Sequence, residues 1–330
     1  MNEELLSRLR CPECGDRLKQ RGAESWLRSV QSVSGTLVSS DGRRSYPVRG
    51  GIVRFVPESN YADNFGMQWN RFSRTQLDSH SGTNISARRF WTATGWSPSQ
   101  LSGKWVLDAG CGSGRFAEVA LGAGANVVAI DYSNAVDACI ANLHAQARLH
   151  VVQADIFKLP FEAGSFDFVY SLGVLQHTPN VRSAFESLSR MVKRGGRLCV
   201  DYYEKSWTAA AHPKYVLRPI TKRLDKERLF SIVNAAIPVM LPISRVLGRV
   251  PVAGGLLRRM VPVANHEGSL PLSKSQLREW AVLDTYDWLS PAYDNPQDAA
   301  TARRWFEDAG FEGIEVLKAG HLVARGQRPE

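Results

Sequence analysis

The stretch Val106-Leu-Asp-Ala-Gly-Cys-Gly-Ser-Gly-Arg115 decides the fold of this chain. Its apolar start predicts a strand, and the pattern that follows predicts a helix over Gly114–Gly122. Between them, glycines at alternate positions let the backbone approach a ligand without obstruction by Cβ atoms. The N-terminus of the helix adds free N–H groups and the positive end of its dipole. We therefore expect a ligand-binding turn at this junction.

The turn departs from the dinucleotide-binding pattern. That pattern places a third glycine at position 115, where this chain has Arg115. Asp108 stands two residues before the first glycine, where a carboxylate suits a ligand with an ammonium group better than one with a pyrophosphate. Both features disfavour an NAD or FAD site.

Outward from the turn, apolar runs alternate with helical stretches, which is typical of a parallel α/β sheet. The expected strands are Trp105–Asp108, Asn126–Asp131, His150–Gln153, Phe166–Ser171 and Arg197–Tyr202, with further helices at Ser133–Ala147 and Val181–Lys193. Near the end of the chain, the pattern predicts a helix over Asp298–Ala309 and an antiparallel hairpin of Gly313–Lys318 and Gly320–Arg325.

Acidic residues end two of these strands. Asp131 ends the second strand, 19 residues after Gly112, where a carboxylate can take both ribose hydroxyls of an adenosine. The alternative, an acid that caps the next helix, better suits Ser133 or Asn134. Asp155 follows the third strand and could accept the adenine amino group, while Ile156 could flank the ring.

Together these residues resemble the class I S-adenosylmethionine-dependent methyltransferases. The likeness covers residues 104–204 closely and 298–326 by topology, and it includes the segment from Ser165 to His177. It implies a Rossmann-like α/β fold with a seven-stranded sheet, its last strand antiparallel, and S-adenosylmethionine across the carboxyl ends of the strands. The cofactor-binding residues implied are Asp108, Gly110, Cys111, Gly112, Gly114, Asp131, Tyr132, Asp155, Ile156, Ser171 and Leu172, with Gln68 and Trp69 covering the cofactor from the N-terminal side.

Features that the chain lacks argue against two classes of methyl acceptor. Enzymes that methylate exocyclic base amines have an Asn/Asp-Pro-Pro-aromatic turn after strand four, and this chain does not. Methylation of cytosine at C5 needs a nucleophilic thiolate. Cys111, Cys139 and Cys199 fall in the cofactor turn, a helix and a strand, so none is expected to attack.

Direct transfer to a hydroxyl, amine or carbon depends mostly on alignment, with a general base where a hydroxyl must lose its proton. His177 lies in the loop that faces the methyl group in this fold, and an imidazole suits base chemistry; alternatively, it orders the turn before Pro179. Asp201, Tyr202 and Tyr203 close the fifth strand and could orient an acceptor. We take His177, Asp201 and Tyr203 as the candidate catalytic residues.

The chain divides into five parts: a ribbon-like head (1–57), a helical segment (58–103), the cofactor-binding core (104–204), a lid insertion (205–295) and a C-terminal helix and hairpin (296–330). This organisation accounts for a length of 330 residues, which exceeds what a bare core needs.

The head carries half of a metal site. Cys11 and Cys14 have the spacing of zinc ligands, but a structural zinc site needs four ligands and no second Cys pair follows. The segment Tyr46–Ile52 resembles the end of a zinc-ribbon-like domain that precedes some bacterial methyltransferases. Zinc at Cys11 and Cys14 is therefore possible, and the alternative is a ribbon without metal that packing stabilises. Short β-like runs are expected at Ser25–Val33, Gly35–Val38 and Tyr46–Phe55.

The later part of the lid, Trp280–Asp294, is rich in aromatic and acidic residues. That mixture suits a sugar or polyol, or else a packed hinge, and it resembles a segment of bacterial methyltransferases of polysaccharide and glycoconjugate biosynthesis. The candidate substrate residues are Arg74, Tyr202, Asp287, Trp288 and Tyr293.

The formal charge of +9 is concentrated in the lid. Residues 205–265 hold 11 basic and 2 acidic side chains, a net +9, so the other parts sum to zero. Cations beside apolar runs are typical of helices that lie on an anionic membrane surface. The alternatives are a lid packed over a pocket, made of short segments broken by prolines 238, 242, 251 and 262, or a site for an acidic acceptor. RNA binding is less favoured because aromatic residues are sparse here.

The N-terminus has no apolar region of a signal peptide, and no window reaches about 18 uninterrupted apolar residues, so we expect no transmembrane helix and a cytoplasmic protein. The function predicted first is methyl transfer from S-adenosylmethionine to a hydroxyl of a small molecule or a carrier-linked glycan intermediate. The alternatives are an RNA methyltransferase that grips its substrate with the head and the basic insertion, and a cofactor-binding accessory subunit without activity.

Overall fold

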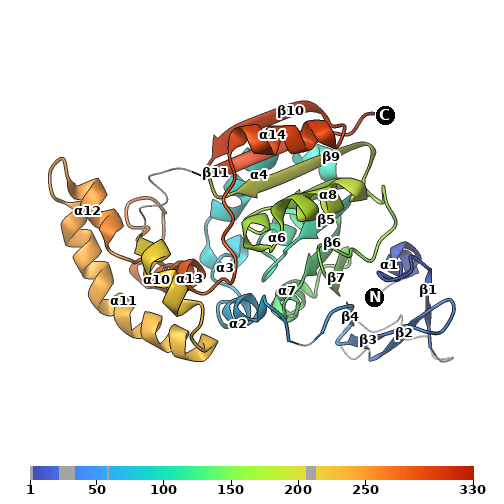
Figure 1. The fold of residues 1–330 in the computed structure, drawn as a ribbon, viewed down its shortest axis with the longest axis horizontal. Coiled ribbons are helices and arrows are strands. Elements are labelled where there is room, and N and C mark those ends of the chain that lie inside the picture. The colour runs from blue at the N-terminus through green and yellow to red at the C-terminus, as the bar shows by residue number, and fades with distance from the viewer. Residues whose placement is uncertain (1–2, 22–33, 58, 206–212) are drawn as a thin grey trace.

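The computed structural model describes residues 3–21, 34–57, 59–205 and 213–330, and Figure 1 shows their arrangement. The predicted strand at Ser25–Val33 lies outside these residues. The strands are β1 (Leu18–Gln20), β2 (Gly35–Ser39), β3 (Ser45–Arg49), β4 (Ile52–Arg54), β5 (Trp105–Ala109), β6 (Asn126–Asp131), β7 (Leu149–Gln153), β8 (Phe166–Ser171), β9 (Val192–Tyr202), β10 (Glu312–Ala319) and β11 (His321–Gln327). The helices are α1 (Glu3–Arg8), α2 (Asp63–Arg71), α3 (Asp78–Ser81), α4 (Ile85–Thr94), α5 (Pro98–Leu101), α6 (Arg115–Gly122), α7 (Ala135–Leu143), α8 (Val181–Met191), α10 (Pro213–Thr221), α11 (Lys226–Gly248), α12 (Gly254–Met260), α13 (Lys274–Leu289) and α14 (Ala299–Asp308), with a short 3₁₀ helix, η2 (Leu175–His177).

One sheet runs through the molecule in the order β1-β2-β3-β4-β7-β6-β5-β8-β9-β11-β10. Its last seven members form the predicted seven-stranded sheet. Strands β7, β6, β5, β8 and β9 pair in parallel, and β11 pairs antiparallel with both β9 and β10. The expected fold class is therefore confirmed.

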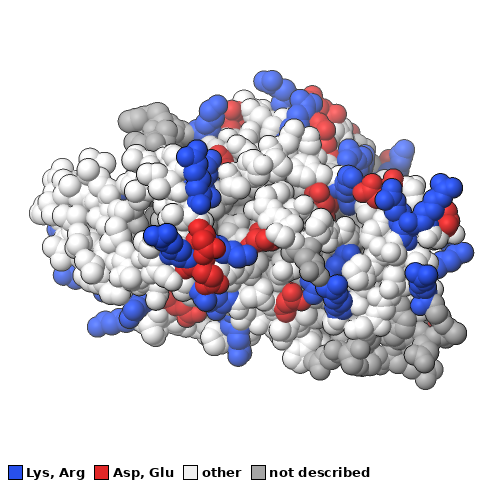
Figure 2. Space-filling model, turned by 60° about the horizontal axis from the view of Figure 1, so that its bottom comes forward, with Lys and Arg blue, Asp and Glu red and all other residues white. Residues whose placement is uncertain are grey.

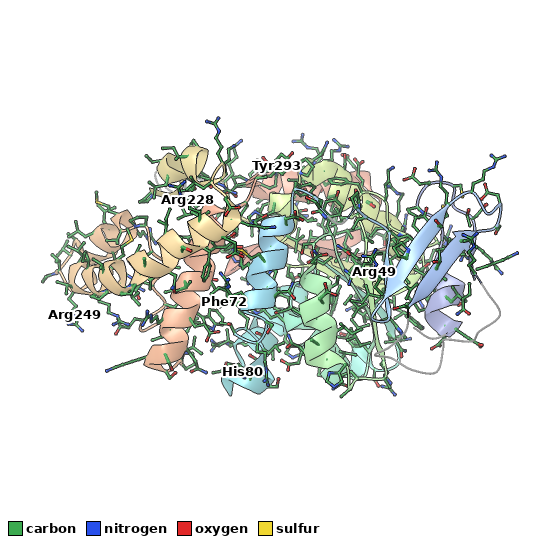
Figure 3. The ribbon with its side chains drawn as sticks, turned by 90° about the horizontal axis from the view of Figure 1, so that it is seen from below. Arg49, Phe72, His80, Arg228, Arg249 and Tyr293 are labelled. Atoms are coloured by element: carbon green, nitrogen blue, oxygen red, sulfur yellow. The ribbon has the colours of Figure 1, made fainter. Side chains whose placement is uncertain are left out.

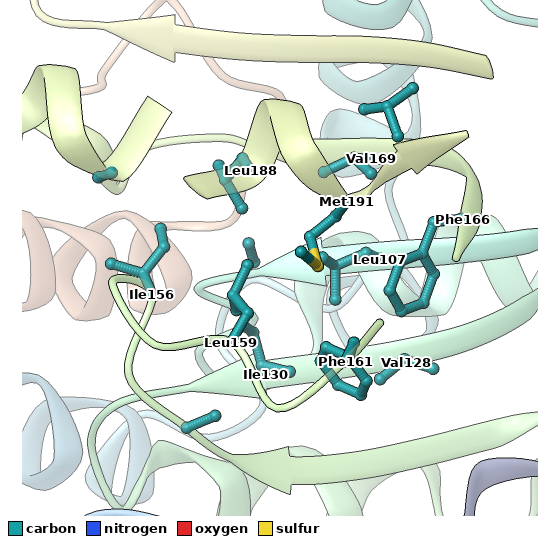
Figure 4. Packing of buried hydrophobic residues seen from close by; sticks show 14 of the residues in the cluster. Leu107, Val128, Ile130, Ile156, Leu159, Phe161, Phe166, Val169, Leu188 and Met191 are labelled. Carbon is teal, nitrogen blue, oxygen red and sulfur yellow. The ribbon is translucent and has the colours of Figure 1, made fainter. Parts of the chain in front are cut away.

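The central strands are buried on both faces because helices cover the sheet on both sides (Figure 1). Side chains alternate along β5: Leu107 joins the apolar cluster under α8 and α14, and Val106 joins the cluster under α4, α6 and α7. Figure 4 shows the first cluster, where Leu107 packs among Val128, Phe166 and other apolar side chains. This packing holds the carboxyl ends of the strands in fixed positions.

The head extends the same sheet. Strand β4 pairs in parallel with β7, with Val53 opposite Val152, so the head is continuous with the core. In the turn that carries the two cysteines, Cys11 is buried with its Sγ 3.1 Å from the Tyr46 hydroxyl, whereas Cys14 is exposed. No group of three or more His, Cys, Asp or Glu side chains that could hold a metal occurs among the described residues. The structure therefore adds no further zinc ligand to the two cysteines.

The lid consists of α10, α11, α12 and α13, and it projects from the core at the left of Figure 1. The prediction that prolines break every long helix here is wrong, because α11 runs from Lys226 to Gly248 through Pro238 and Pro242. A proline inside a helix costs about 3 kcal/mol. Burial of the α11 stripe Leu229, Val233, Ile237 and Leu241 in the lid cluster with α13 compensates this loss.

Helix α11 meets the length and composition of a membrane-spanning helix, although none was expected from the sequence. Within the described residues it is the one helix that is long and apolar enough to cross a membrane by length and composition, and 28% of its most apolar window is buried. No uninterrupted apolar run signals it in the sequence, because Ser231, Asn234 and Ser244 interrupt the pattern.

Candidate active site

A cavity of about 1130 Å³ lies at the carboxyl ends of the parallel strands. Residues that follow β5, β6, β7, β8 and β9 form its floor, and α2, α4 and α13 supply its walls. It has two parts, which we call the cofactor half and the acceptor half. The cofactor half is lined by Tyr61, Phe65, Gln68, Trp69, Gly110, Cys111, Gly112, Asp131, Tyr132, Ile156 and Leu172. The acceptor half is lined by Arg88, Arg89, Arg115, His177, Tyr203, Arg259, His266, Trp280, Asp284, Asp287, Trp288 and His321.

The glycine turn forms the floor of the cofactor half. Gly110 has a φ of +89°, and a Cβ there would lie 2.4 Å from a Val174 methyl. A Cβ at Gly112 would lie 3.2 Å from the Trp69 indole, so the ring packs directly on the turn. Only glycine satisfies both the backbone conformation and the close contact at position 110.

Asp131 joins this turn to the end of β6. Its Oδ2 accepts a hydrogen bond from the Gly112 N–H at 3.0 Å, and its Oδ1 accepts from the backbone and hydroxyl of Ser133 at 2.8 and 2.7 Å. Burial raises the pKa of this carboxyl above its ordinary value. These bonds fix the carboxylate at the wall of the cavity. Helix α7 has Asn134 at its N-cap, so Asp131 is not the capping residue.

Helix α2 lines the cofactor half with Gln68 and Trp69, the two residues expected to cover the cofactor. Gln68 is 1% exposed, and its Nε2 lies 3.5 Å from Asp287 Oδ1 of the lid. Its Oε1 is buried and has no hydrogen-bond partner among the described residues. A buried amide oxygen of this kind is costly unless a ligand supplies the donor.

Four of the predicted cofactor residues do not line the cavity. Gly114 packs under the turn, where its φ is +95° and a Cβ would lie 2.7 Å from Leu143 Cδ1. Ser171 is fully buried and donates to the Ala109 carbonyl at 2.8 Å, which joins β8 to β5. Asp155 accepts from the Phe157 N–H at 2.9 Å and so holds the turn that presents Ile156. These three residues stabilise the loops around the cavity but do not line it.

Asp108 is the fourth of these residues. It is 2% exposed beneath the turn, and its Oδ2 has no hydrogen-bond partner among the described residues. Burial raises its pKa to about 7. The side chain therefore carries a proton in part of the molecules at neutral pH, and an ammonium group placed nearby would favour the charged form.

His177 lines the acceptor half, at the end of η2. Its Nδ1 lies 3.1 Å from the Tyr293 carbonyl, which can only accept, so in the neutral ring Nδ1 carries the hydrogen. Nε2 is then left with its lone pair. Burial lowers the pKa of His177, so the neutral form dominates at pH 7.

A polar cluster surrounds His177. The Tyr203 ring packs edge-on against the imidazole with centroids 5.4 Å apart, and its hydroxyl lies 3.3 Å from Asp287 Oδ2. Asp287 comes from α13, so the lid supplies the carboxylate and the core supplies the imidazole. Burial raises the pKa of Asp287. The cluster can position a hydroxyl group next to an imidazole that accepts a proton.

Other predicted catalytic and substrate residues lie elsewhere. Asp201 is 1% exposed and accepts from Arg89 Nη2 at 2.9 Å, so it positions an arginine of the cavity wall instead of facing the cavity. Tyr202 points to the opposite face of the sheet and packs on Trp305, which does not support its substrate role. Arg74 is exposed and does not line the cavity, while Tyr293 contributes its carbonyl to His177. Trp288 lines the acceptor half as expected.

Sequence analysis missed several residues of the acceptor half. Arg115, read only as the residue that replaces a glycine, is 9% exposed and donates through Nε to Ser86 and through Nη1 to Gln76. His266 Nε2 lies 2.6 Å from Asp284 Oδ2, and both residues belong to the lid. No motif marks these positions, because tertiary packing alone brings them to the cavity.

The sheet order and the glycine turn define a nucleotide-binding α/β domain of the methyltransferase type, and comparison with known proteins agrees. The methyltransferase domain family matches residues 107–200. Ubiquinone biosynthesis O-methyltransferase of Cronobacter sakazakii is 35% identical over 138 residues, which are 39% of this chain and 56% of that protein. The chain thus spans little more than half the length of this relative. Residues 107–200 therefore carry a methyltransferase domain, and this part of the chain is similar to S-adenosylmethionine-dependent methyltransferases.

Two further proteins cover more of the chain. Demethylmenaquinone methyltransferase of Lactococcus lactis is 27% identical over 243 residues, 70% of this chain and 77% of that protein. The crystal structure of a putative S-adenosylmethionine-dependent methyltransferase from Methanococcus maripaludis covers 83% of this chain and 96% of its own, with 12% identity and a TM-score of 0.44.

The cofactor half fits S-adenosylmethionine. The turn at Gly110 is closed to a side chain but open to a ligand, and Asp131 places a carboxylate where a ribose would bind. Ile156 and Tyr132 offer apolar surface for an adenine ring. The buried Oε1 of Gln68, which has no hydrogen-bond donor among the described residues, can accept a hydrogen bond from the ligand. These residues would hold the cofactor.

Proposed function

We propose that this protein transfers a methyl group from S-adenosylmethionine to a hydroxyl group of a small or carrier-linked acceptor. The observation that carries the proposal is the position of His177, which lines the cavity near Tyr203 and Asp287 while its Nδ1 is held by the Tyr293 carbonyl. The bound cofactor supplies an electrophilic methyl group on a sulfonium. The chain must then align a hydroxyl oxygen and remove its proton.

In this proposal His177 accepts the proton of the hydroxyl through Nε2. The Tyr293 carbonyl holds Nδ1–H, which fixes the tautomer that leaves Nε2 free. Asp287 and Tyr203 form hydrogen bonds with the polar groups of the methyl acceptor. The carboxylate near the imidazole also stabilises the imidazolium after proton transfer.

The walls of the acceptor half favour a polar methyl acceptor whose ring can stack on aromatic side chains. Trp280 and Trp288 provide flat apolar surface, and Asp284 and Asp287 provide hydrogen-bond acceptors for hydroxyl groups. This combination supports a sugar or polyol acceptor, as the aromatic and acidic composition of Trp280–Asp294 suggested.

The same half also favours an acceptor with an anionic group. Arg115 is buried, its pKa is lowered to about 9 by burial, and its Nη2 has no hydrogen-bond partner among the described residues. Arg88 and Arg259 are exposed cations on the same wall. A phosphate or carboxylate would satisfy these donors, as in a carrier-linked acceptor.

The experiment is a methyl-transfer assay with S-adenosylmethionine labelled in its methyl group and fractionated cell extract. We expect label in a small or lipid-extractable product as an O-methyl group, formed about 100-fold or more slowly with His177→Gln. Label found only in RNA would contradict the proposal. Cofactor binding by calorimetry without transfer to any fraction would instead indicate an accessory subunit.

A further inference from the structure

The exposed apolar residues of this protein are concentrated on the lid. Among the described residues, eleven large hydrophobic side chains are exposed, and ten of them belong to α10, α11, α12 or the loop before α12. We call these ten the apolar lid face: Val216, Ile220, Ile232, Val239, Ile243, Val246, Val250, Val252, Leu256 and Met260. Several of these side chains are more than 60% exposed. On an ordinary protein surface, exposed apolar residues are scattered singly and are not gathered on one group of helices.

Helix α11 has two apolar stripes. Its exposed members Ile232, Val239, Ile243 and Val246 fall within an arc of roughly 60° at about 100° per residue. The buried stripe, Leu229 to Leu241, points to another side and packs against α13. Packing within the lid therefore explains the inner stripe and leaves the outer stripe without a partner in the described chain.

Exposed cations accompany this face. Residues 213–265 carry ten Lys or Arg and two acidic side chains, and three of the cations pair with acids outside this range: Lys214 and Arg218 with Asp294, and Arg245 with Glu267. Lys222, Arg223, Arg228 and Arg249 are exposed, and no ion pair or side-chain hydrogen bond engages them among the described residues. Figure 3 shows Arg228 and Arg249 towards opposite ends of α11, and Figure 2 shows this lobe as mostly uncharged with cations at its margin. Apolar surface bordered by free cations complements a layer of anionic headgroups over acyl chains.

The face is continuous with the cavity. Arg259 lines the acceptor half, and its neighbours on α12 are Leu256 and Met260 of the apolar lid face. Ser269 and Leu270, which follow α12, also line the cavity. An acceptor carried at the surface against this face would therefore lie next to the cavity entrance.

We propose that the apolar lid face docks into the interface of an anionic lipid bilayer, with α11 parallel to the membrane plane. A spanning orientation would surround α11 with lipid, which the packing of its inner stripe against α13 prevents. Membrane docking does not depend on the proposed methyl transfer, because docking is measured without cofactor and without methyl acceptor.

The test is co-sedimentation of the whole chain with vesicles of phosphatidylcholine alone and of phosphatidylcholine containing about one third phosphatidylglycerol. We expect binding at least about tenfold tighter to the anionic vesicles, weakened by salt. The double variant Val239→Asn, Val246→Asn should bind at least about tenfold more weakly, because two apolar side chains no longer enter the interface.

Charge variants separate the electrostatic part. Lys222→Glu with Arg223→Glu should weaken binding at least about tenfold. The matched control, Arg303→Glu with Arg304→Glu on α14, makes the same change of charge on an exposed part of the core and should bind like the wild type. Unchanged cofactor affinity in all variants shows that they are folded.

Three results would overturn the proposal. Equal binding to neutral and anionic vesicles would remove the role of the cations. Absence of binding together with concentration-dependent dimers in light scattering would assign the face to a second copy of the chain. Resistance of the vesicle-bound protein to alkaline carbonate extraction would indicate a spanning helix instead of an interfacial one.

Discussion

The two halves of the cavity are built in different ways. The floor of the cofactor half lies on the ends of buried parallel strands and is held by local bonds such as Asp131 to Gly112, whereas its cover on α2 meets the lid through Gln68 and Asp287. The acceptor half combines core residues such as His177 with lid residues such as Asp287, which are more than a hundred positions apart in the chain. We expect substitutions on the floor of the cofactor half to change cofactor binding and substitutions in the acceptor half to change methyl transfer. The variants below test that separation.

The largest effect is expected in the acceptor half. His177→Gln removes the proton acceptor and should lower the methyl-transfer rate by about 100-fold or more. The His177 ring contacts Phe65 of the cofactor half, with centroids 5.2 Å apart, so we expect weak coupling and a dissociation constant of S-adenosylmethionine within about tenfold of the wild-type value. The measurement is a rate with labelled cofactor together with calorimetry, and a parallel loss of cofactor affinity would show that the halves are not independent.

In the cofactor half, Asp131→Ala should weaken S-adenosylmethionine binding by about 100-fold, since hydrogen bonds to a charged group contribute about 1.5–3 kcal/mol each. Asp137→Ala on α7 is the matched control, because it removes the same charge from a residue outside the cavity. Calorimetry checks both variants. Equal affinity of the Asp131→Ala variant and the control would refute the ribose assignment.

The glycine turn is tested by a pair of substitutions. Gly110→Ala and Gly50→Ala both place a side chain at positive φ, at a cost of about 1–2 kcal/mol each. Only at Gly110 does the new Cβ meet a neighbour, 2.4 Å away on Val174, whereas nothing lies within 4 Å at Gly50. We expect about tenfold weaker cofactor binding and a further loss of unfolding free energy for Gly110→Ala alone. Denaturant titration and calorimetry give both quantities, and identical behaviour of the pair would contradict the close packing.

The smallest effect is a pH dependence. Burial lowers the pKa of His177, so the neutral base persists below the ordinary imidazole pKa of about 6.5. The transfer rate at saturating substrates should therefore stay flat from about pH 8 to 6.5 and fall only at lower pH, as the ring takes up a proton. A rate that already falls above about pH 7 would show a different titrating group.

The sequence predicted the cofactor half better than the acceptor half for a physical reason. Turn conformation and strand ends are local properties, so Gly110, Gly112 and Asp131 were predicted and line the cavity. The pairing of His266 with Asp284 and the burial of Arg115 arise from tertiary packing, which no periodicity reports. The substrate role predicted for Tyr202 is wrong for a different, local reason: side chains alternate along β9, so Tyr202 lies on the face opposite to Asp201.

The lid shows the same limit. Prolines in the sequence predicted short segments, because the penalty for a proline in a helix is local and the compensating contacts are not. The inner stripe of α11 meets α13 across about fifty residues of chain, so the long helix forms despite Pro238 and Pro242.

The most direct test of the two-part cavity is a crystal structure of the whole chain with S-adenosylhomocysteine. The expected result is the ligand in the cofactor half, with its ribose hydroxyls on Asp131, its amino acid part along Gly110 and Gly112, and its sulfur towards His177. A cavity without ligand at saturating concentration, or a ligand bound among the lid residues, would contradict the account.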